Sequence, residues 1–220
     1  NYSERLLHHW TNAVRVDPSA FKEDYIDGGC RWNQFSEDEK TPKAPLMWNQ
    51  GLNEAARFHT EDMDTNDWFF HESSDLTSFP DRLDRYYSGG YAGENIAWGY
   101  ESIFHAVTVG WMCSTTGHRE NMMSGDYNEL GTGVVGKYYT QDFGGRNISY
   151  RLISMGVHTP QTPRGSVEFF ADFYDEDGRS PDRVEVILDG QAYELGLLYG
   201  EENQGVWTAE VETDTEGCHS

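Results

Sequence analysis

The sequence predicts an α+β layered domain over residues 1–160, a linker over 161–165 and a small all-β unit over 166–220. Before residue 128, apolar residues recur at the three- and four-residue spacing of amphipathic helices. After it, runs rich in β-branched and aromatic residues alternate with glycine and asparagine, as strands and turns do. Helices that precede a group of strands are typical of a helical layer packed on an antiparallel sheet.

The expected helices cover the first half of the chain. Helical spacing predicts a helix over residues 3–16 and a second one that begins near Leu46 and places His59 on its apolar face. A third long helix is expected over 101–114, and short helices begin at Phe79 and Gly117. Residues 17–45 are polar and interrupted by glycine and proline, so they are expected to form a long surface connection.

The expected strands follow residue 128. Residues 130–135, 138–143 and 150–157 are predicted to form an antiparallel meander. Beyond the linker, four strand-like runs form about half of an immunoglobulin-like sandwich, and Asp189-Gly190 is a strong hairpin signal between two of them. This unit either packs against the first domain or has lost C-terminal strands, and an end at Ser220 without a polar tail favours loss.

Composition restricts the partners. The chain has 38 acidic and 16 basic residues and a formal net charge of -22, which argues against nucleic acid and anionic membrane surfaces as partners. Such a charge favours solubility in a saline or extracellular setting. No apolar run approaches the length of a membrane span. The chain begins at Asn1 rather than Met, so we expect that a leader was removed or that the sequence is a prepared piece.

The three cysteines, Cys30, Cys113 and Cys218, permit at most one intrachain disulfide, and the spacing leaves the pairing open. The absence of a CxxC pattern argues against a cysteine-based zinc site. Because Cys113 lies in an apolar helical stretch, we expect a buried, inert thiol there.

Three polar residues stand in segments too rich in glycine for an ordinary core. His71 follows three aromatic residues, and it is either a loop histidine or part of a site. Glu94 follows Gly93, which permits a tight turn and close backbone approach, so Glu94 either caps a helix or is an acid fixed in a cleft. His118 is expected at a helix N-terminus, where a lowered pKa suits a base or a metal ligand.

The other histidines are given no role. His59 is expected to be a satisfied core histidine, and His8 and His9 are expected at the surface. His105 lies beside the apolar stripe of its helix.

Six ordered motifs carry a resemblance to a known family. They are Pro45-Leu46-Met47-Trp48-Asn49, Phe69-Phe70-His71, Gly93-Glu94-Asn95-Ile96-Ala97-Trp98-Gly99, Gly117-His118-Arg119-Glu120-Asn121, Leu130-Gly131-Thr132-Gly133-Val134 and Tyr139-Thr140-Gln141-Asp142-Phe143-Gly144. Over roughly residues 3–158 the chain resembles the CAP superfamily of cysteine-rich secretory proteins, antigen 5 and plant pathogenesis-related proteins of class 1. It is most similar to the bacterial SCP-like extracellular branch.

The resemblance implies an α-β-α sandwich, secretion, and a central cleft with two histidines and two glutamates that binds zinc or another divalent ion in several members. By motif, the first histidine is His71, the first glutamate Glu94 and the second histidine His118. The second glutamate position is Ser114, so the set of four is incomplete. The resemblance says nothing about residues 164–220.

Three hypotheses about function stay open. The first is a metal-dependent peptidase or other hydrolase, in which His71, His118 and Glu94 bind the metal ion and carry the catalysis. The second is a binding module for a peptide, lipid, sterol or protein, with an apolar groove lined by Trp68, Phe69, Phe70, Trp98 and Tyr139. The third is a buried polar network that only stabilises the fold. Substrate, metal identity and oligomeric state are left open by the sequence.

Overall fold

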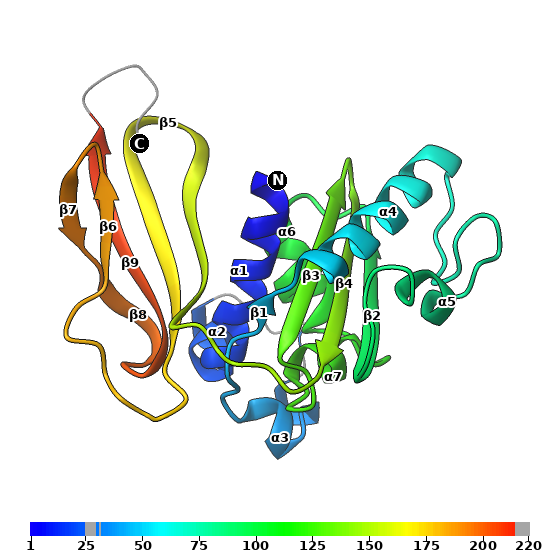
Figure 1. The fold of residues 1–220 in the computed structure, drawn as a ribbon, viewed down its shortest axis with the longest axis horizontal. Coiled ribbons are helices and arrows are strands. Elements are labelled where there is room, and N and C mark those ends of the chain that lie inside the picture. Colours follow the sequence, from blue (N-terminus) through cyan, green and yellow to red (C-terminus); the bar gives the residue numbers. More distant parts are fainter. Residues whose placement is uncertain (25–29, 31, 214–220) are drawn as a thin grey trace.

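The computed structural model describes residues 1–24, 30 and 32–213, and it confirms an α-β-α sandwich followed by an all-β unit (Figure 1). Cys218 lies outside the described residues. The helical elements are α1 (Tyr2–Val16), α2 (Pro18–Asp24), a 3₁₀ turn (Trp32–Gln34), α3 (Glu37–Lys40), α4 (Gln50–Asn66), α5 (Phe79–Leu83), α6 (Ile103–His105), a π-helical segment (Ala106–Trp111) and α7 (His118–Met123).

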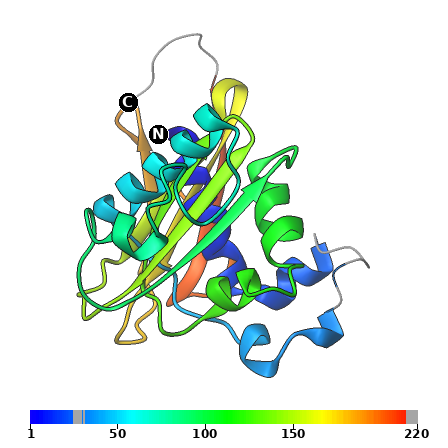
Figure 2. The same cartoon turned by 90° about the vertical axis from the view of Figure 1, so that its right-hand side faces the viewer.

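The strands form two larger sheets and one hairpin. They are β1 (Met47–Trp48), β2 (Tyr91–Trp98), β3 (Glu129–Val135), β4 (Tyr138–Gly145), β5 (Ile153–Tyr174), β6 (Glu185–Leu188), β7 (Gln191–Glu194), β8 (Gly196–Glu201) and β9 (Gln204–Thr213). The first sheet has the order β1-β3-β4-β2, in which β1 is parallel to β3 and the other pairs are antiparallel. In Figure 2, α4 lies on one side of this sheet and residues 103–111 on the other.

Two glycines let α4 lie directly on the sheet. A Cβ atom at Gly131 would stand 2.0 Å from Asn53 N, and one at Gly133 would stand 2.4 Å from Ala56 O. Only glycine permits so close an approach of a helix backbone to a strand. This contact explains why two glycines stand inside strand β3.

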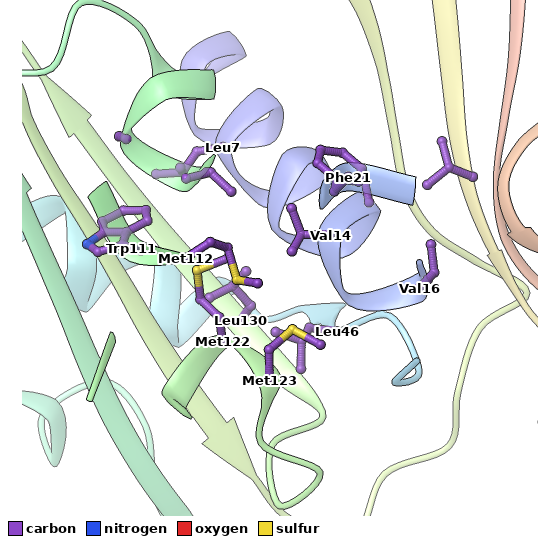
Figure 3. Packing of buried hydrophobic residues seen from close by; sticks show 14 of the residues in the cluster. Leu7, Val14, Val16, Phe21, Leu46, Trp111, Met112, Met122, Met123 and Leu130 are labelled. Atoms are coloured by element: carbon purple, nitrogen blue, oxygen red, sulfur yellow. The ribbon is translucent and has the colours of Figure 1, made fainter. Parts of the chain in front are cut away.

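The main core lies between the other face of the sheet and α1. Leu7 and Val14 of α1 pack with Trp111, Met122 and Leu130, all fully buried (Figure 3). Trp111 also donates a hydrogen bond from Nε1 to Ile96 O at 3.1 Å, so its polar atom is satisfied inside the core. Burial of each such side chain stabilises the fold by about 1.5–3 kcal/mol.

β5 is a long segment that doubles back on itself (Figure 1). Tyr174 N donates to Leu152 O at 2.9 Å, so the two ends of the segment meet. Its second arm pairs with β9, and β9 pairs with β8. The prediction that 150–157 joins the first sheet is wrong, because this stretch belongs to the second sheet instead. Residues 161–165, expected as a linker, lie within β5.

The C-terminal unit shares a core with the sandwich. Phe170, Tyr199 and Val206 belong to the same buried cluster as Val14 and Val16 of α1. α1 is therefore covered by the first sheet on one side and by the second sheet on the other. This double cover is the reason that His8 and His9, expected at the surface, are both fully buried.

Two further expectations are corrected. Residues 17–45 are not a plain connection, because they contain two short helices and a 3₁₀ turn that bury Phe21 and Phe35 in the main core. The long helix expected over 101–114 is α-helical only at 103–105 and continues as a π-helix, in which Met112 N donates to Val107 O at 3.0 Å. The Asp189-Gly190 hairpin is present between β6 and β7, and both residues have positive φ (53° and 79°), as a type I′ turn requires.

Candidate functional site

Strand β2 positions Glu94 on the sheet. The turn that Gly93 permits is not formed, because residues 91–98 are extended and pair with β4. The close approach that it also permits is present, since a Cβ atom there would stand 2.4 Å from Tyr127 Oη. The Glu94 side chain is almost fully buried, so its charge needs a partner.

That partner is Arg82 in α5. Its guanidinium forms an ion pair with Glu94 Oε2, and both side chains are buried. The same group donates to His71 O at 3.0 Å and to Ser73 Oγ at 3.1 Å. Arg82 therefore fixes both the carboxylate and the loop that carries His71. No sequence signal singled it out, because an arginine in a short helix is usually exposed.

His71 meets the other oxygen of Glu94. Its Nδ1 atom lies 2.9 Å from Glu94 Oε1, and its side chain is 51% exposed. Because a carboxylate only accepts, Nδ1 carries the proton and Nε2 is left facing solvent. The hydrogen bond to Glu94 raises the pKa of His71, and partial burial opposes this effect. Residues 71 and 94 are thus brought together as a carboxylate-oriented imidazole.

His118 is the first residue of α7, as the sequence predicts. Asn95 Nδ2 donates to His118 O at 3.0 Å, and Asn121 Nδ2 donates to Asn95 Oδ1 at 2.9 Å, so this end of α7 is tied to β2. Burial lowers the pKa of His118, and charge on His71 lowers it further. His118 therefore favours the neutral form.

Two more titratable side chains face Glu94. His59 Nε2 lies 3.0 Å from Phe70 O and 3.9 Å from Glu94 Oε2, and burial lowers the pKa of His59. Asp142 is fully buried opposite Glu94 on β4, and burial followed by the Glu94 charge raises the pKa of Asp142 well above its usual range. Asp142 thus favours the neutral, protonated form. The negative charge that pairs with Arg82 is therefore that of Glu94. The sequence placed Asp142 in a motif without assigning it a role.

Of the three metal donors expected from the sequence, His71, Glu94 and His118, Glu94 is already engaged with other side chains. Within residues 1–24, 30 and 32–213, no group of three or more His, Cys, Asp or Glu side chains is arranged to hold a metal ion. Both oxygens of Glu94 already have partners in His71 and Arg82. The imidazoles of His71 and His118 remain as donors, with Glu94 behind His71 as the carboxylate that orients it.

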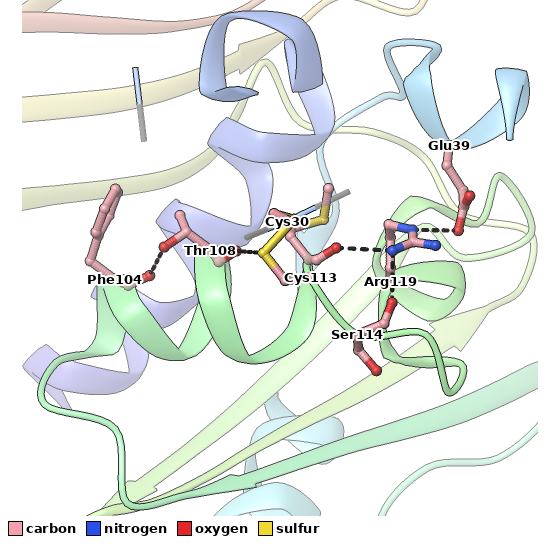
Figure 4. Close-up of a disulfide and its surroundings, with 8 residues drawn as sticks. Cys30, Glu39, Phe104, Thr108, Cys113, Ser114 and Arg119 are labelled. Carbon is pink, nitrogen blue, oxygen red and sulfur yellow. Dashed lines mark hydrogen bonds and ion pairs between the residues drawn. A yellow bond between two sulfur atoms is a disulfide. The ribbon is translucent and has the colours of Figure 1, made fainter. Parts of the chain in front are cut away.

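The segment before His118 is held by a disulfide and an arginine (Figure 4). Cys30 and Cys113 are bonded across 83 residues, so the expectation of an inert Cys113 thiol is wrong. Arg119 Nη1 donates to Met112 O at 3.2 Å and to Ser114 O at 2.7 Å, and its Nε donates to Glu39 at 2.8 Å. Ser114 thus lies in a fixed turn.

The aromatic residues near His71 are only partly those expected. Phe69, Phe70 and Trp98 are 41%, 56% and 57% exposed. Tyr139 instead belongs to the main core and donates to Tyr100 O at 3.2 Å. Its neighbour Tyr138 makes the contacts on this side, with ring centroids 6.4 Å from Phe69 and 6.1 Å from Trp98.

Comparisons with known proteins agree on the first part of the chain. The family model described as the cysteine-rich secretory protein family, CAP, matches residues 9–150. An uncharacterized membrane protein of Bacillus subtilis, YlbC, is 44% identical over 101 residues, which cover 46% of this chain and 29% of that protein. A second uncharacterized B. subtilis protein, YkwD, is 32% identical over 114 residues, which cover 50% and 44%. The chain thus spans less than half the length of these relatives.

Two solved structures superpose on part of the chain, with TM-scores below 0.5. An extracellular protein with an SCP domain from Bacillus anthracis is 39% identical, covers 46% of this chain and 34% of that one, and has a TM-score of 0.43. A cysteine-rich secretory protein from Staphylococcus aureus is 18% identical, covers 64% and 37%, and has a TM-score of 0.45. Separately, no helix in the described part of the chain has the length and apolar character needed to cross a membrane.

Proposed function

This chain belongs to the cysteine-rich secretory protein (CAP) family, and from that premise we propose that it is an extracellular protein whose His71 and His118 bind one divalent metal ion, with zinc favoured, and hydrolyse peptide bonds. The Cys30–Cys113 disulfide supports the extracellular location, because such bonds persist in oxidising compartments. The B. anthracis relative is itself described as extracellular.

The observation that carries the proposal is the His71–Glu94–Arg82 arrangement. Metal-binding histidines commonly donate their second N–H to a carboxylate, which fixes the ring and its tautomer. Here Nδ1 of His71 faces Glu94 at 2.9 Å, and Arg82 holds that carboxylate in place. The exposed Nε2 atom of His71 is thereby directed to solvent as a potential ligand.

His118 supplies the second donor. Its lowered pKa keeps the ring neutral near pH 7, so a lone pair is available. A bound zinc ion would supply an activated water and polarise a substrate carbonyl. The chain's own contribution is to orient His71 through Glu94 and to hold α7 in place through Asn95 and Asn121.

Metal titration of single variants tests the proposal. We expect calorimetry with zinc to give one site in the wild type and at least about tenfold weaker binding in His71→Ala and in His118→Ala. His105→Ala is the matched control, because His105 is an exposed histidine on α6. Unchanged zinc affinity in His118→Ala would overturn the metal site. Hydrolysis of a broad peptide panel by wild type and His118→Ala then tests catalysis.

The second candidate is a binding module without catalysis. The exposed rings of Phe69, Phe70 and Trp98 favour it, because soluble proteins rarely leave aromatic side chains together in water without a partner. Zinc binding with no hydrolysis of any peptide would select this function. The purely structural hypothesis requires a sealed triad, and the half-exposed ring of His71 does not fit it.

A further inference from the structure

The surface beside His71 combines aromatic rings with acidic side chains. We call the aromatic surface the set Trp68, Phe69, Phe70, Trp98 and Tyr138. Its rings form two groups: Trp68 lies 4.6 Å from Phe70, and Tyr138 lies 6.4 Å from Phe69 and 6.1 Å from Trp98 between ring centroids. The second group links the segment before His71 to the end of β2.

Acidic side chains predominate around this surface, and the exposed Lys137, which precedes Tyr138, is the nearby basic residue in the chain. Residues 58–81 contain seven Asp or Glu and no Lys or Arg. Asp67 accepts a hydrogen bond from Tyr138 Oη at 3.2 Å, so one of these acids lies directly at the rings. Glu72 follows His71, and its backbone oxygen accepts from Trp68 Nε1 at 2.8 Å. An anionic ligand is repelled here, and a neutral lipid gains nothing from the acids.

A cationic side chain gains from both features. Ammonium and guanidinium groups are attracted to the faces of aromatic rings and to nearby carboxylates. The chain uses this combination internally: the Arg119 guanidinium lies 3.9 Å from the Phe35 ring centroid and donates to Glu39. An arginine of another molecule would find the same two partners, ring and carboxylate, on the aromatic surface.

We propose that the aromatic surface binds arginine- or lysine-containing peptide segments and presents them to His71. This inference rests on the proposed function, since it names the substrate class of that site. The position of the rings supports it, because Phe70 immediately precedes His71 in the chain. A basic side chain that lies on Phe70 places the peptide backbone near the half-exposed imidazole of His71.

Calorimetry with two short probes tests the proposal at low salt. We expect acetylated tri-arginine amide to bind and the equally long tri-citrulline amide, which lacks the charge, to bind at least about fivefold more weakly. Raising sodium chloride from 0.05 to 0.5 M should weaken the arginine probe, because the acids around the rings become screened. Equal binding of both probes would overturn the proposal.

Matched variants separate this surface from the general attraction of an acidic protein. Trp98→Ala and Phe70→Ala should each weaken tri-arginine about two- to fivefold. Phe58→Ala is the control, because Phe58 is a comparably exposed aromatic residue (40%) that contacts Tyr86 instead. Asp67→Asn should weaken binding more than Glu202→Gln, which removes an exposed acid from the β8–β9 turn. If each variant and its control weakened tri-arginine binding equally, the aromatic surface would not be the binding site.

Two further results separate this inference from the metal site. His118→Ala should lose zinc and keep tri-arginine affinity, whereas Trp98→Ala should keep zinc and lose tri-arginine affinity. If tri-arginine fails to bind while phosphatidylcholine vesicles do bind and Trp98→Ala abolishes this, the surface is a lipid site and the peptide proposal is wrong. A wild type that binds the arginine probe but no zinc would leave the surface assigned and overturn the metal site.

Discussion

Two of the histidine–carboxylate contacts in the described part of the chain, His9–Asp172 and His71–Glu94, use the same chemistry in opposite surroundings. His9 Nδ1 lies 2.7 Å from Asp172 Oδ1, and both side chains are excluded from water. His71 Nδ1 lies 2.9 Å from Glu94 Oε1, but its ring is half exposed. Residue type and distance therefore do not distinguish the pair of the proposed site from the sealed one. The distinction comes from solvent access to the second ring nitrogen.

The sealed pair connects the two parts of the chain. Asn12 Nδ2 donates to Asp172 Oδ2 at 3.0 Å, and Asn12 Oδ1 accepts from Leu46 N at 2.8 Å. His8 Nε2 lies 2.8 Å from Leu46 O, so α1, the segment before β1, and β5 share one buried network. Glu94 of the open pair contacts Arg82 and lies 3.9 Å from His59 Nε2, while the ring of His71 is half exposed. We expect the first pair to matter for stability and the second for binding.

Alanine substitution at the two histidines gives the largest difference. His9→Ala should lower the free energy of unfolding by about 3–5 kcal/mol, because the buried Asp172 would lose the imidazole and keep the Asn12 amide, and the missing ring would leave a cavity. His71→Ala should lower it by about 1 kcal/mol or less, since Glu94 keeps Arg82 and the lost ring is half exposed. Urea unfolding followed by circular dichroism measures both. If both variants lost a similar free energy of unfolding, solvent access would not distinguish the two histidine–carboxylate pairs.

Acidification should lower the free energy of unfolding through His8, which belongs to the buried network around His9 and Asp172. Burial lowers the pKa of His8 from 6.5 to about 4, so the folded protein keeps this ring neutral while the unfolded chain binds a proton below pH 6.5. The free energy of unfolding should therefore fall by up to about 3 kcal/mol between pH 6.5 and pH 4 through His8 alone. The raised pKa of His71 acts oppositely: its contribution is present below pH 6.5 and is lost as pH rises through the folded value.

The variant His8→Gln isolates this effect. It retains a hydrogen-bonding side chain near Leu46 O and removes the titration, so its unfolding free energy should fall less between pH 6.5 and pH 4 than that of the wild type. Denaturant unfolding at both pH values gives the difference. A wild-type profile that runs parallel to that of His8→Gln would contradict the assignment of the acid loss to His8.

The segment before His118 is held by a covalent bond, whereas the sealed pair is held by hydrogen bonds. Reduction of Cys30–Cys113 should lower the unfolding free energy by about 2–4 kcal/mol, because the bond closes a long loop. It should also increase hydrogen exchange in α7, since Cys113 precedes the turn that leads to His118. Unchanged exchange in α7 would show that Arg119 holds this segment without the disulfide.

Salt should produce the smallest effect. Raising ionic strength from 0.05 to 1 M should lower the pKa of His71 by a few tenths of a unit, because exposed charge interactions are screened. The chemical shifts of His9 should stay constant under the same change, as its partner is buried. Two-dimensional NMR of the imidazole resonances measures both residues in one sample. Movement of His9 would mean that water reaches the sealed pair.

Local patterns predicted the elements that are set locally. Gly117 and His118 mark the start of α7, and Asp189-Gly190 forms the expected hairpin, because turn geometry depends on adjacent residues. Strand β2 was missed, since a run with Gly93 and few β-branched residues gives little strand signal without its partner β4. The resemblance, rather than periodicity, supplied the set of His71, Glu94 and His118.

The contacts that were missed all join distant parts of the chain. Asp172 lies 163 residues from His9, and Cys113 lies 83 residues from Cys30, so no spacing rule could pair them. Arg82 became part of the site only because α5 packs beside the loop that ends at Ser73. Such partners are selected by tertiary packing, which single-sequence patterns do not encode.

The shared core around α1 has a practical consequence for dividing the chain. The family match ends at residue 150, but Phe170, Tyr199 and Val206 cover the side of α1 that the first sheet leaves bare. A fragment that ends at residue 160 would expose this apolar side of α1. It would also remove Asp172, the hydrogen-bond partner of the buried Asn12 and His9. Expressed alone, it should aggregate, whereas a product ending at residue 213 should remain monodisperse. The folding unit is therefore larger than the region that the family model matches.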